Sequence, residues 1–157
     1  MAAFRSTVLT LAAALAFVYG VPRAALSAPS DPCSLLAQAE VSAALGVSVD
    51  AGKPTGKICR WAGPRGRAGQ SPAVVLTLQD AKAFDFAKSP SKSPTLSKTP
   101  AAGVGDDAVF NTVGTVTATL TVKKGDTYFE VHVYGFPVDQ TKTMEATLAK
   151  EVVANLK

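Results

Sequence analysis

The stretch TVTATLTVKKGDTYFEVHVYG, residues 115–135, carries the strongest structural signal in the chain. Two runs of alternating polar and apolar residues flank a polar segment that contains Gly125. Because successive side chains of a β-strand point to opposite faces, this alternation predicts two strands that each have one apolar and one polar face. The predicted apolar positions are Val116, Ala118, Leu120, Val122, Phe129, Val131 and Val133.

The segment between the two runs is short enough to form the turn of an antiparallel hairpin. A loop with an even number of residues, either 124–125 or 123–126, places apolar side chains opposite apolar side chains. Gly125 lies inside both loops and can adopt the positive φ that such a turn needs. The predicted register pairs Leu120 with Phe129 and Ala118 with Val131.

Helical and strand patterns precede this hairpin. Asp31 can cap an N-terminal helix that starts at Pro32 and ends at Gly46, and a break near Ala37 would divide this helix in two. The segments that follow are predicted to be a connector (47–57), a strand (57–63), a Gly/Pro/Arg turn (63–72), a strand (73–80), a short helix (81–89) and a flexible Lys/Ser/Pro-rich loop (88–100).

A C-terminal helix follows the hairpin. Pro137 ends the second strand, and Asp139 or Thr141 can cap a helix with an apolar stripe at every fourth residue. The order of helix, strands, short helix, strands and helix has no βαβ repeat. We therefore expect an α+β fold with two layers, a mainly antiparallel sheet and helices packed on one face. The predicted stripe consists of Met144, Leu148, Val152 and Leu156.

Residues 1–27 have the composition of a signal peptide. Arg5 supplies a positive charge, the apolar run 8–18 is too short to span a bilayer comfortably, and residues 25–27 (ALS) fit a cleavage site. We therefore expect a periplasmic or secreted protein whose mature part, residues 28–157, forms a single domain.

The charge of the chain is nearly balanced once these residues are set aside. The full sequence has 16 basic and 12 acidic residues and a net charge of +4. Cleavage after Ser27 would remove Arg5 and Arg23 and no acidic residue, which lowers the net charge to +2. Such a balance gives no overall field to hold nucleic acid or an anionic membrane, so neither is expected as a partner.

Cys33 and Cys59 are the only two cysteines in the sequence. Ser30, Asp31 and Pro32 precede Cys33, in place of the small and apolar residues that a lipid-anchored cysteine requires. We therefore expect no stable membrane anchor after signal cleavage. Two cysteines in an exported chain predict one disulfide, whose oxidised sulfurs can act neither as nucleophiles nor as metal ligands.

Several segments together resemble a family of small exported bacterial proteins and lipoproteins that is catalogued as a domain of unknown function. The matching segments are DPCSLLAQAEVSAALG (31–46), CRW (59–61), GVGDDAVF (103–110), LTVKKGDTYFEVHVYG (120–135) and EATLAKEVVANL (145–156). The resemblance implies an α+β fold, an envelope or secreted location and pairing of Cys33 with Cys59. It implies no particular activity, and this chain lacks the lipidation motif of the lipoprotein members.

The sequence offers little catalytic machinery. His132, the only histidine, lies between Glu130 and Tyr134 on the predicted polar face. A hydrolase could use His132 and Glu130, but no nucleophile or oxyanion donor is recognisable beside them. A single histidine without a free cysteine does not suffice for a zinc site, and we expect no cofactor. Asp106 and Asp107 lack the alternating ligand spacing of an EF-hand and predict a turn before a strand.

Two further features have structural interpretations. Trp61, close to Cys59, is expected to pack over the disulfide. Arg60, Arg65 and Arg67 form a local basic patch that could meet an acidic envelope component, although a solvated loop is the default interpretation.

The polar face of the hairpin is therefore the candidate binding face. Its threonines and phenols could bind a protein or a small ligand through hydrogen bonds and flat apolar area. We expect a non-enzymatic binding or accessory protein of the envelope. An envelope hydrolase and a purely structural envelope protein are the alternatives. The candidate residues are Thr117, Thr119, Tyr128, Glu130, His132 and Tyr134.

Overall fold

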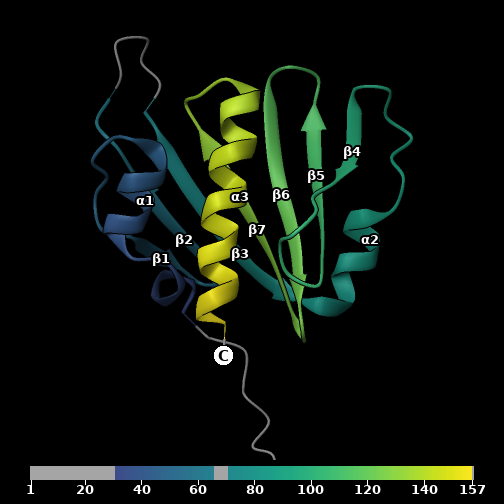
Figure 1. Ribbon diagram of the computed structural model, residues 1–157, viewed down its shortest axis with the longest axis horizontal. Coiled ribbons are helices and arrows are strands. Elements are labelled where there is room, and N and C mark those ends of the chain that lie inside the picture. The colour runs from purple at the N-terminus through teal and green to yellow at the C-terminus, as the bar shows by residue number, and fades with distance from the viewer. Residues whose placement is uncertain (1–30, 66–70, 157) are drawn as a thin grey trace, which may run out of the picture.

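The computed structural model describes residues 31–65 and 71–156, which form one seven-stranded antiparallel sheet with helices packed against it (Figure 1). The strand order is β1-β2-β3-β7-β6-β5-β4, so every neighbouring pair except β3 and β7 is consecutive in the sequence. The sheet therefore consists of two meanders joined by β3 and β7. The strands are β1 (Lys53–Thr55), β2 (Ile58–Ala62), β3 (Ala73–Asp80), β4 (Leu96–Pro100), β5 (Asp107–Val113), β6 (Thr117–Lys124) and β7 (Thr127–Tyr134).

The predicted hairpin is present as β6 and β7, but its register differs from the prediction by two residues. Leu120 pairs with Val131, and Val122 pairs with Phe129. A shift of two residues keeps each side chain on its predicted face, so the apolar residues still meet one another. Val116 is an exception, because it lies in the turn before β6 with 81 % of its surface exposed.

A contact from outside the hairpin holds its turn in the observed register. The turn consists of Gly125 and Asp126, with Gly125 at φ +56° as predicted. The Gly125 N–H donates to Asp106 Oδ2 at 2.7 Å, and Lys124 forms an ion pair with Asp106 Oδ1 at 2.8 Å. Asp106 lies in the turn before β5, as predicted for this pair of aspartates, and it stabilises the turn between β6 and β7.

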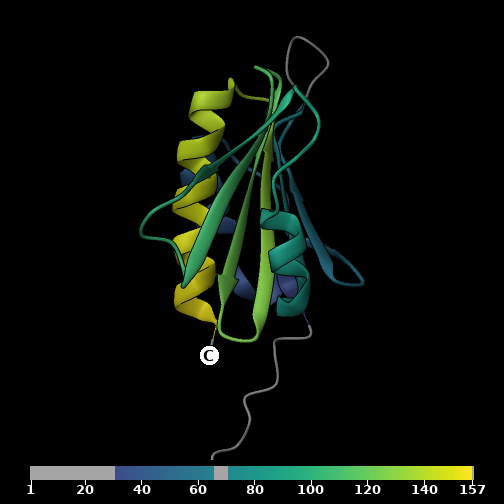
Figure 2. The same ribbon diagram turned by 90° about the vertical axis from the view of Figure 1, so that its right-hand side faces the viewer.

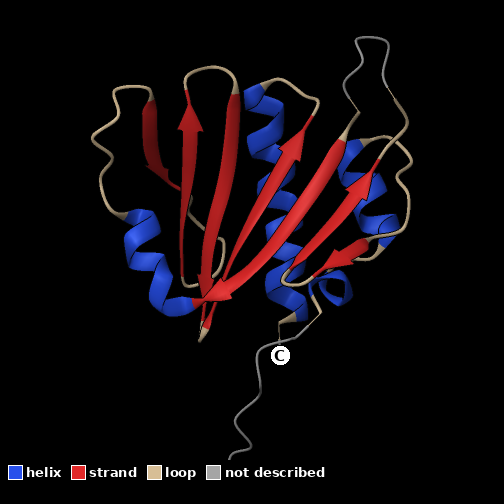
Figure 3. Ribbon diagram, turned by 180° about the vertical axis from the view of Figure 1, so that it is seen from behind, coloured by secondary structure: helices blue, strands red, loops and turns tan. Residues whose placement is uncertain are grey.

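The helices cover the two faces of the sheet unequally. Helices α1 (Gln38–Leu45) and α3 (Val138–Asn155) lie on the apolar face (Figure 2). The short helix α2 (Phe84–Lys88), which follows the 3-10 turn η2 (Ala81–Ala83), lies against the other face (Figure 3). The α+β class and the antiparallel sheet are thus confirmed, and α2 is the exception to the expectation that helices occupy one face.

The N-terminal helix is divided as the sequence suggested. Asp31 accepts a hydrogen bond from the Cys33 N–H at 2.9 Å and caps the 3-10 helix η1 (Pro32–Leu35). The chain is extended at Ala37, and α1 then runs to the glycine that ends it, Gly46, at φ +67°.

The C-terminal helix begins earlier than predicted. Pro137 occupies the N-cap position of α3, so neither Asp139 nor Thr141 is the cap. Met144 and Leu156 are only half-buried and flank the buried stripe. The buried stripe consists of Thr141, Glu145, Leu148, Ala149 and Val152.

The predicted disulfide joins Cys33 to Cys59, with Cα atoms 5.1 Å apart. It connects η1 to β2. Trp61 is buried beside it, as expected, and Gly52 packs so closely that an added Cβ would lie 2.7 Å from Cys59 Sγ.

Two segments that were predicted to be irregular contain edge strands. β1 lies within the predicted connector 47–57, and β4 forms the end of the predicted loop 88–100. Edge strands tolerate proline because its missing N–H can face away from the neighbouring strand, and Pro54 and Pro100 occupy such positions. The composition that predicted a loop is therefore compatible with a strand at this place in the sheet.

Two sequence predictions fall on other parts of the chain. The predicted signal peptide, residues 1–27, and Arg67 lie outside the described residues. Among the described residues, no helix is both long and apolar enough to cross a lipid bilayer.

Candidate functional site

Among the described residues, the sheet face opposite α3, which we call the open face, is covered only near α2 (Figure 3). Strand pairing aligns residues across it in rows. Lys53, Arg60, Val75 and His132 form one row through β1, β2, β3 and β7. Side chains in one row point to the same face, so two cations lie on the same side of the sheet as the histidine.

Helix α2 removes one predicted residue from the open face. Tyr128 lies on the predicted polar face, but only 2 % of its surface is accessible, because the Phe84 ring packs edge-on against it with centroids 5.9 Å apart. The Tyr128 hydroxyl donates to Glu130 Oε1. Burial and this carboxylate raise the pKa of Tyr128. Tyr128 is therefore a packing residue with a satisfied hydroxyl.

The predicted site residues separate into two groups. Thr119, Tyr128 and Glu130 line a hollow of about 410 Å³ beside α2. Thr117, His132 and Tyr134 line a pocket of about 490 Å³ at the opposite end of the strands, which we call the open-end pocket. Each of the two cavities is thus lined by three of the six predicted site residues.

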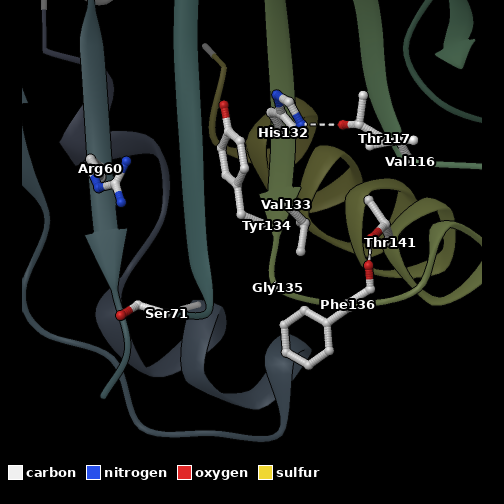
Figure 4. Close-up of a pocket in the computed structure, with 10 residues that line it drawn as sticks. All are labelled: Arg60, Ser71, Val116, Thr117, His132, Val133, Tyr134, Gly135, Phe136 and Thr141. Carbon is white, nitrogen blue, oxygen red and sulfur yellow. Dashed lines mark hydrogen bonds between the residues drawn. The ribbon is translucent and has the colours of Figure 1, made fainter. Parts of the chain in front are cut away.

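His132 is held by two neighbours in the open-end pocket (Figure 4). Thr117 Oγ1 and His132 Nε2 share a hydrogen bond of 2.7 Å. The Tyr134 ring stacks on the imidazole with centroids 3.9 Å apart and an angle of 24°. Burial lowers the pKa of His132. The histidine is therefore a neutral, oriented group at neutral pH, and 42 % of the Tyr134 surface remains exposed beside it.

The open-end pocket lies where the ladder between β6 and β7 has ended. Their ladder stops at the pair Leu120 and Val131, although β6 begins at Thr117 and β7 continues to Tyr134. The pocket is lined in addition by Val133 and by Thr141 of α3 (Figure 4). It therefore extends toward the helix at the place where strand pairing is missing.

Glu145 of α3 satisfies backbone groups at the gap and was missed by the sequence prediction. Its side chain is 0 % exposed, and its Oε1 accepts a hydrogen bond from the Val133 N–H at 3.1 Å. Burial raises the pKa of Glu145 to about 8, although hydrogen bonds from the backbone of Val133 and Leu120 and the nearby Lys142 lower it. Glu145 is therefore a neutral acid at pH 7 that spans β6 and β7. Among the described residues, its Oε2 has no hydrogen-bond partner.

The sequence contained a signal for Glu145. It lies three residues before Leu148 and four before Ala149, which places it on the buried stripe of the helix. A buried carboxyl group at such a position needs a hydrogen-bond donor, and the Val133 N–H, which has no partner on β6, provides one.

The open-end pocket has a cationic edge. Arg60 is exposed on β2 and lines the pocket together with Ser71. None of the described lining residues is acidic, and the ion pairs among the described residues involve only Lys88 with Asp107 and Lys124 with Asp106.

The site does not assemble the catalytic arrangement considered from the sequence. Glu130 accepts the Tyr128 hydroxyl and has no hydrogen bond to His132 in the described structure. No group of three potential metal ligands occurs within residues 31–65 and 71–156. Comparisons with protein-family models, curated proteins and solved structures found no match to this chain.

Proposed function

We propose that this protein is an exported, non-enzymatic binding or accessory protein of the bacterial envelope that holds a small ligand in the open-end pocket. The observation that carries the proposal is the exposed Tyr134 ring stacked on His132 at the mouth of a cavity of about 490 Å³. Small-molecule sites are concave, span roughly 300–1,000 Å³ and combine aromatic surface with a few polar groups.

The proposed location is supported by two independent features. The first 27 residues have the pattern of a cleavable signal peptide. The disulfide between Cys33 and Cys59 is of the kind that persists in oxidising compartments such as the periplasm or the cell exterior.

The test uses His132 as its own reporter. Because the chain has one histidine, its imidazole gives a single Hε1–Cε1 resonance in a ¹H–¹³C NMR spectrum. We expect a screen of small sugars, amino acids and organic acids to include compounds that shift this resonance saturably. Tyr134→Ala should abolish the shift, whereas Phe86→Ala, which removes an aromatic ring that is 86 % exposed outside this pocket, should leave it unchanged. A screen without any saturable shift would favour a purely structural envelope protein.

One observation favours an envelope hydrolase as a second candidate. Thr117 Oγ1 lies 2.7 Å from Nε2 of a neutral imidazole, which is the spacing of a nucleophile and its base. The carboxylate that would orient the imidazole is engaged elsewhere, since Glu130 binds Tyr128. Hydrolysis of p-nitrophenyl acetate distinguishes the two functions. The binding proposal expects Thr117→Val to hydrolyse the ester at the same rate as the unaltered protein, and a large loss of rate would support the hydrolase.

A further inference from the structure

We infer that the open-end pocket takes a small organic acid, whose carboxylate is bound by Arg60 and whose ring or apolar part lies on Tyr134. This inference rests on the proposed function and adds the chemical class of the ligand.

The charge of the pocket favours an anion. Arg60 is the one permanently charged side chain among the described residues that line the cavity, and His132 is neutral because burial lowers its pKa. Lys53 pairs with Arg60 across β1 and β2 and adds a second positive charge on the same face. Arg60 has no ion-pair partner among the described residues, so its guanidinium is available. An arginine fork matches a carboxylate with two parallel hydrogen bonds.

The spacing of the charged and aromatic groups suits a ligand with a single ring. Arg60 and His132 are both paired with Val75, so they lie two strands apart in one row. Neighbouring strands are about 4.8 Å apart, which separates the two backbones by about 10 Å. Figure 4 shows Arg60 and His132 on either side of the Tyr134 ring. A ligand ring that lies on the Tyr134 ring can therefore direct its carboxylate toward Arg60.

The remaining walls are apolar with hydroxyl groups between them. Val116 and Phe136 contribute apolar surface, and Ser71 and Thr141 contribute hydroxyls. The Thr141 hydroxyl already donates to the Phe136 carbonyl oxygen at 3.4 Å. Of these two hydroxyls, that of Ser71 is therefore the better placed to donate a hydrogen bond to a ligand. Apolar walls with one cation at the edge select a ligand that is partly apolar and carries one negative charge.

The experiment compares benzoate with benzamide, a neutral molecule of nearly the same shape, by titration of the His132 imidazole resonance. Ligands of this size bind with a Kd on the order of 1–10 mM, so concentrations up to about 20 mM are needed. We expect a saturable shift with benzoate and at least about fivefold weaker binding of benzamide, since the charge-assisted hydrogen bonds are lost. Added salt should weaken binding of benzoate and not of benzamide.

Two exposed arginines provide the variant and its control. Arg60→Gln should weaken benzoate binding to the level of benzamide, whereas Arg65→Gln, which removes an exposed arginine that does not line the pocket, should leave it unchanged. Equal binding of benzoate and benzamide, or no effect of Arg60→Gln, would overturn the anion inference while leaving ligand binding at the pocket intact. Absence of any shift with benzoate would also overturn it, and the broader screen then decides the proposed function separately.

Discussion

Replacement of Glu145 by glutamine should remove a specific part of the pH dependence of stability. The amide has nearly the same shape as the protonated carboxyl, and its oxygen can still accept the hydrogen bond from the Val133 N–H. The difference between the two side chains is that only the acid can titrate. The variant therefore isolates the effect of burying this acid between α3 and the separated strands.

The magnitude follows from the shift of the pKa. Glu145 has an ordinary pKa of 4.5, which burial raises to about 8 in the folded protein. Between these values the unfolded chain loses the proton and the folded protein keeps it, so the free energy of unfolding falls as the pH rises. The contribution is present in full below pH 4.5 and is lost as the pH approaches 8. At about 1.4 kcal/mol per pKa unit, the loss has an upper limit of about 5 kcal/mol.

The assay is urea unfolding at several pH values between 5 and 8 for both proteins. We expect the unaltered protein to lose stability relative to Glu145→Gln by about 2–4 kcal/mol across this range. Glu151→Gln removes an exposed carboxylate of the same helix and should keep the pH dependence of the unaltered protein. Parallel pH profiles for Glu145→Gln and the unaltered protein would refute the reasoning, because Glu145 would then titrate alike in both states.

Three other predictions concern the scaffold. Replacing Cys33 and Cys59 with serine should lower the free energy of unfolding by about 3–4 kcal/mol in urea, because a bridge across 26 residues constrains the unfolded chain; an unchanged midpoint would contradict this. Gly52→Ala should destabilise the fold by about 1–3 kcal/mol and lower Tm, since its Cβ would lie 2.7 Å from the bridge sulfur. Asp106→Asn should speed hydrogen exchange of the Gly125 amide. The hydrogen bond from the Gly125 N–H lowers the pKa of Asp106. The stabilisation of the turn by this carboxylate is therefore present above pH 3.8 and is lost as the pH falls through the lowered pKa. An unchanged exchange rate in the variant would show that Asp106 does not stabilise the turn.

The sequence predicted features that depend on local patterns. Alternation along β6 and β7 gave the correct face for Leu120 and Phe129, and Gly125 marked the turn. The alternation does not distinguish registers that differ by two residues, and the contact of Asp106 with the turn comes from a different strand connection, so it cannot be read from the hairpin sequence. The burial of Tyr128 likewise depends on Phe84 of a different helix.

The candidate site was only partly predictable for the same reason. His132 and Tyr134 were selected because they alternate on one strand, and the structure does place both at one pocket. Arg60 joins them only through the pairing of β2, β3 and β7, which brings together residues far apart in the chain. Glu145 accepts the Val133 N–H because β6 and β7 separate there. The polar and apolar residues of both strands continue to alternate through this gap, so the sequence pattern does not reveal it.

The junction between the two meanders also determines how the chain folds. Within each meander, neighbouring strands pair by closing short loops. The β3–β7 ladder instead joins Ala73 to Tyr134 and encloses all of β4, β5 and β6. Because the entropy of closing such a loop is lost before its contacts form, this pairing is expected to be the slow step of folding. Until the β3–β7 pairing forms, each of these two strands has an unpaired apolar edge that can associate with other chains. The protein is therefore expected to be most prone to aggregation before this pairing completes the sheet.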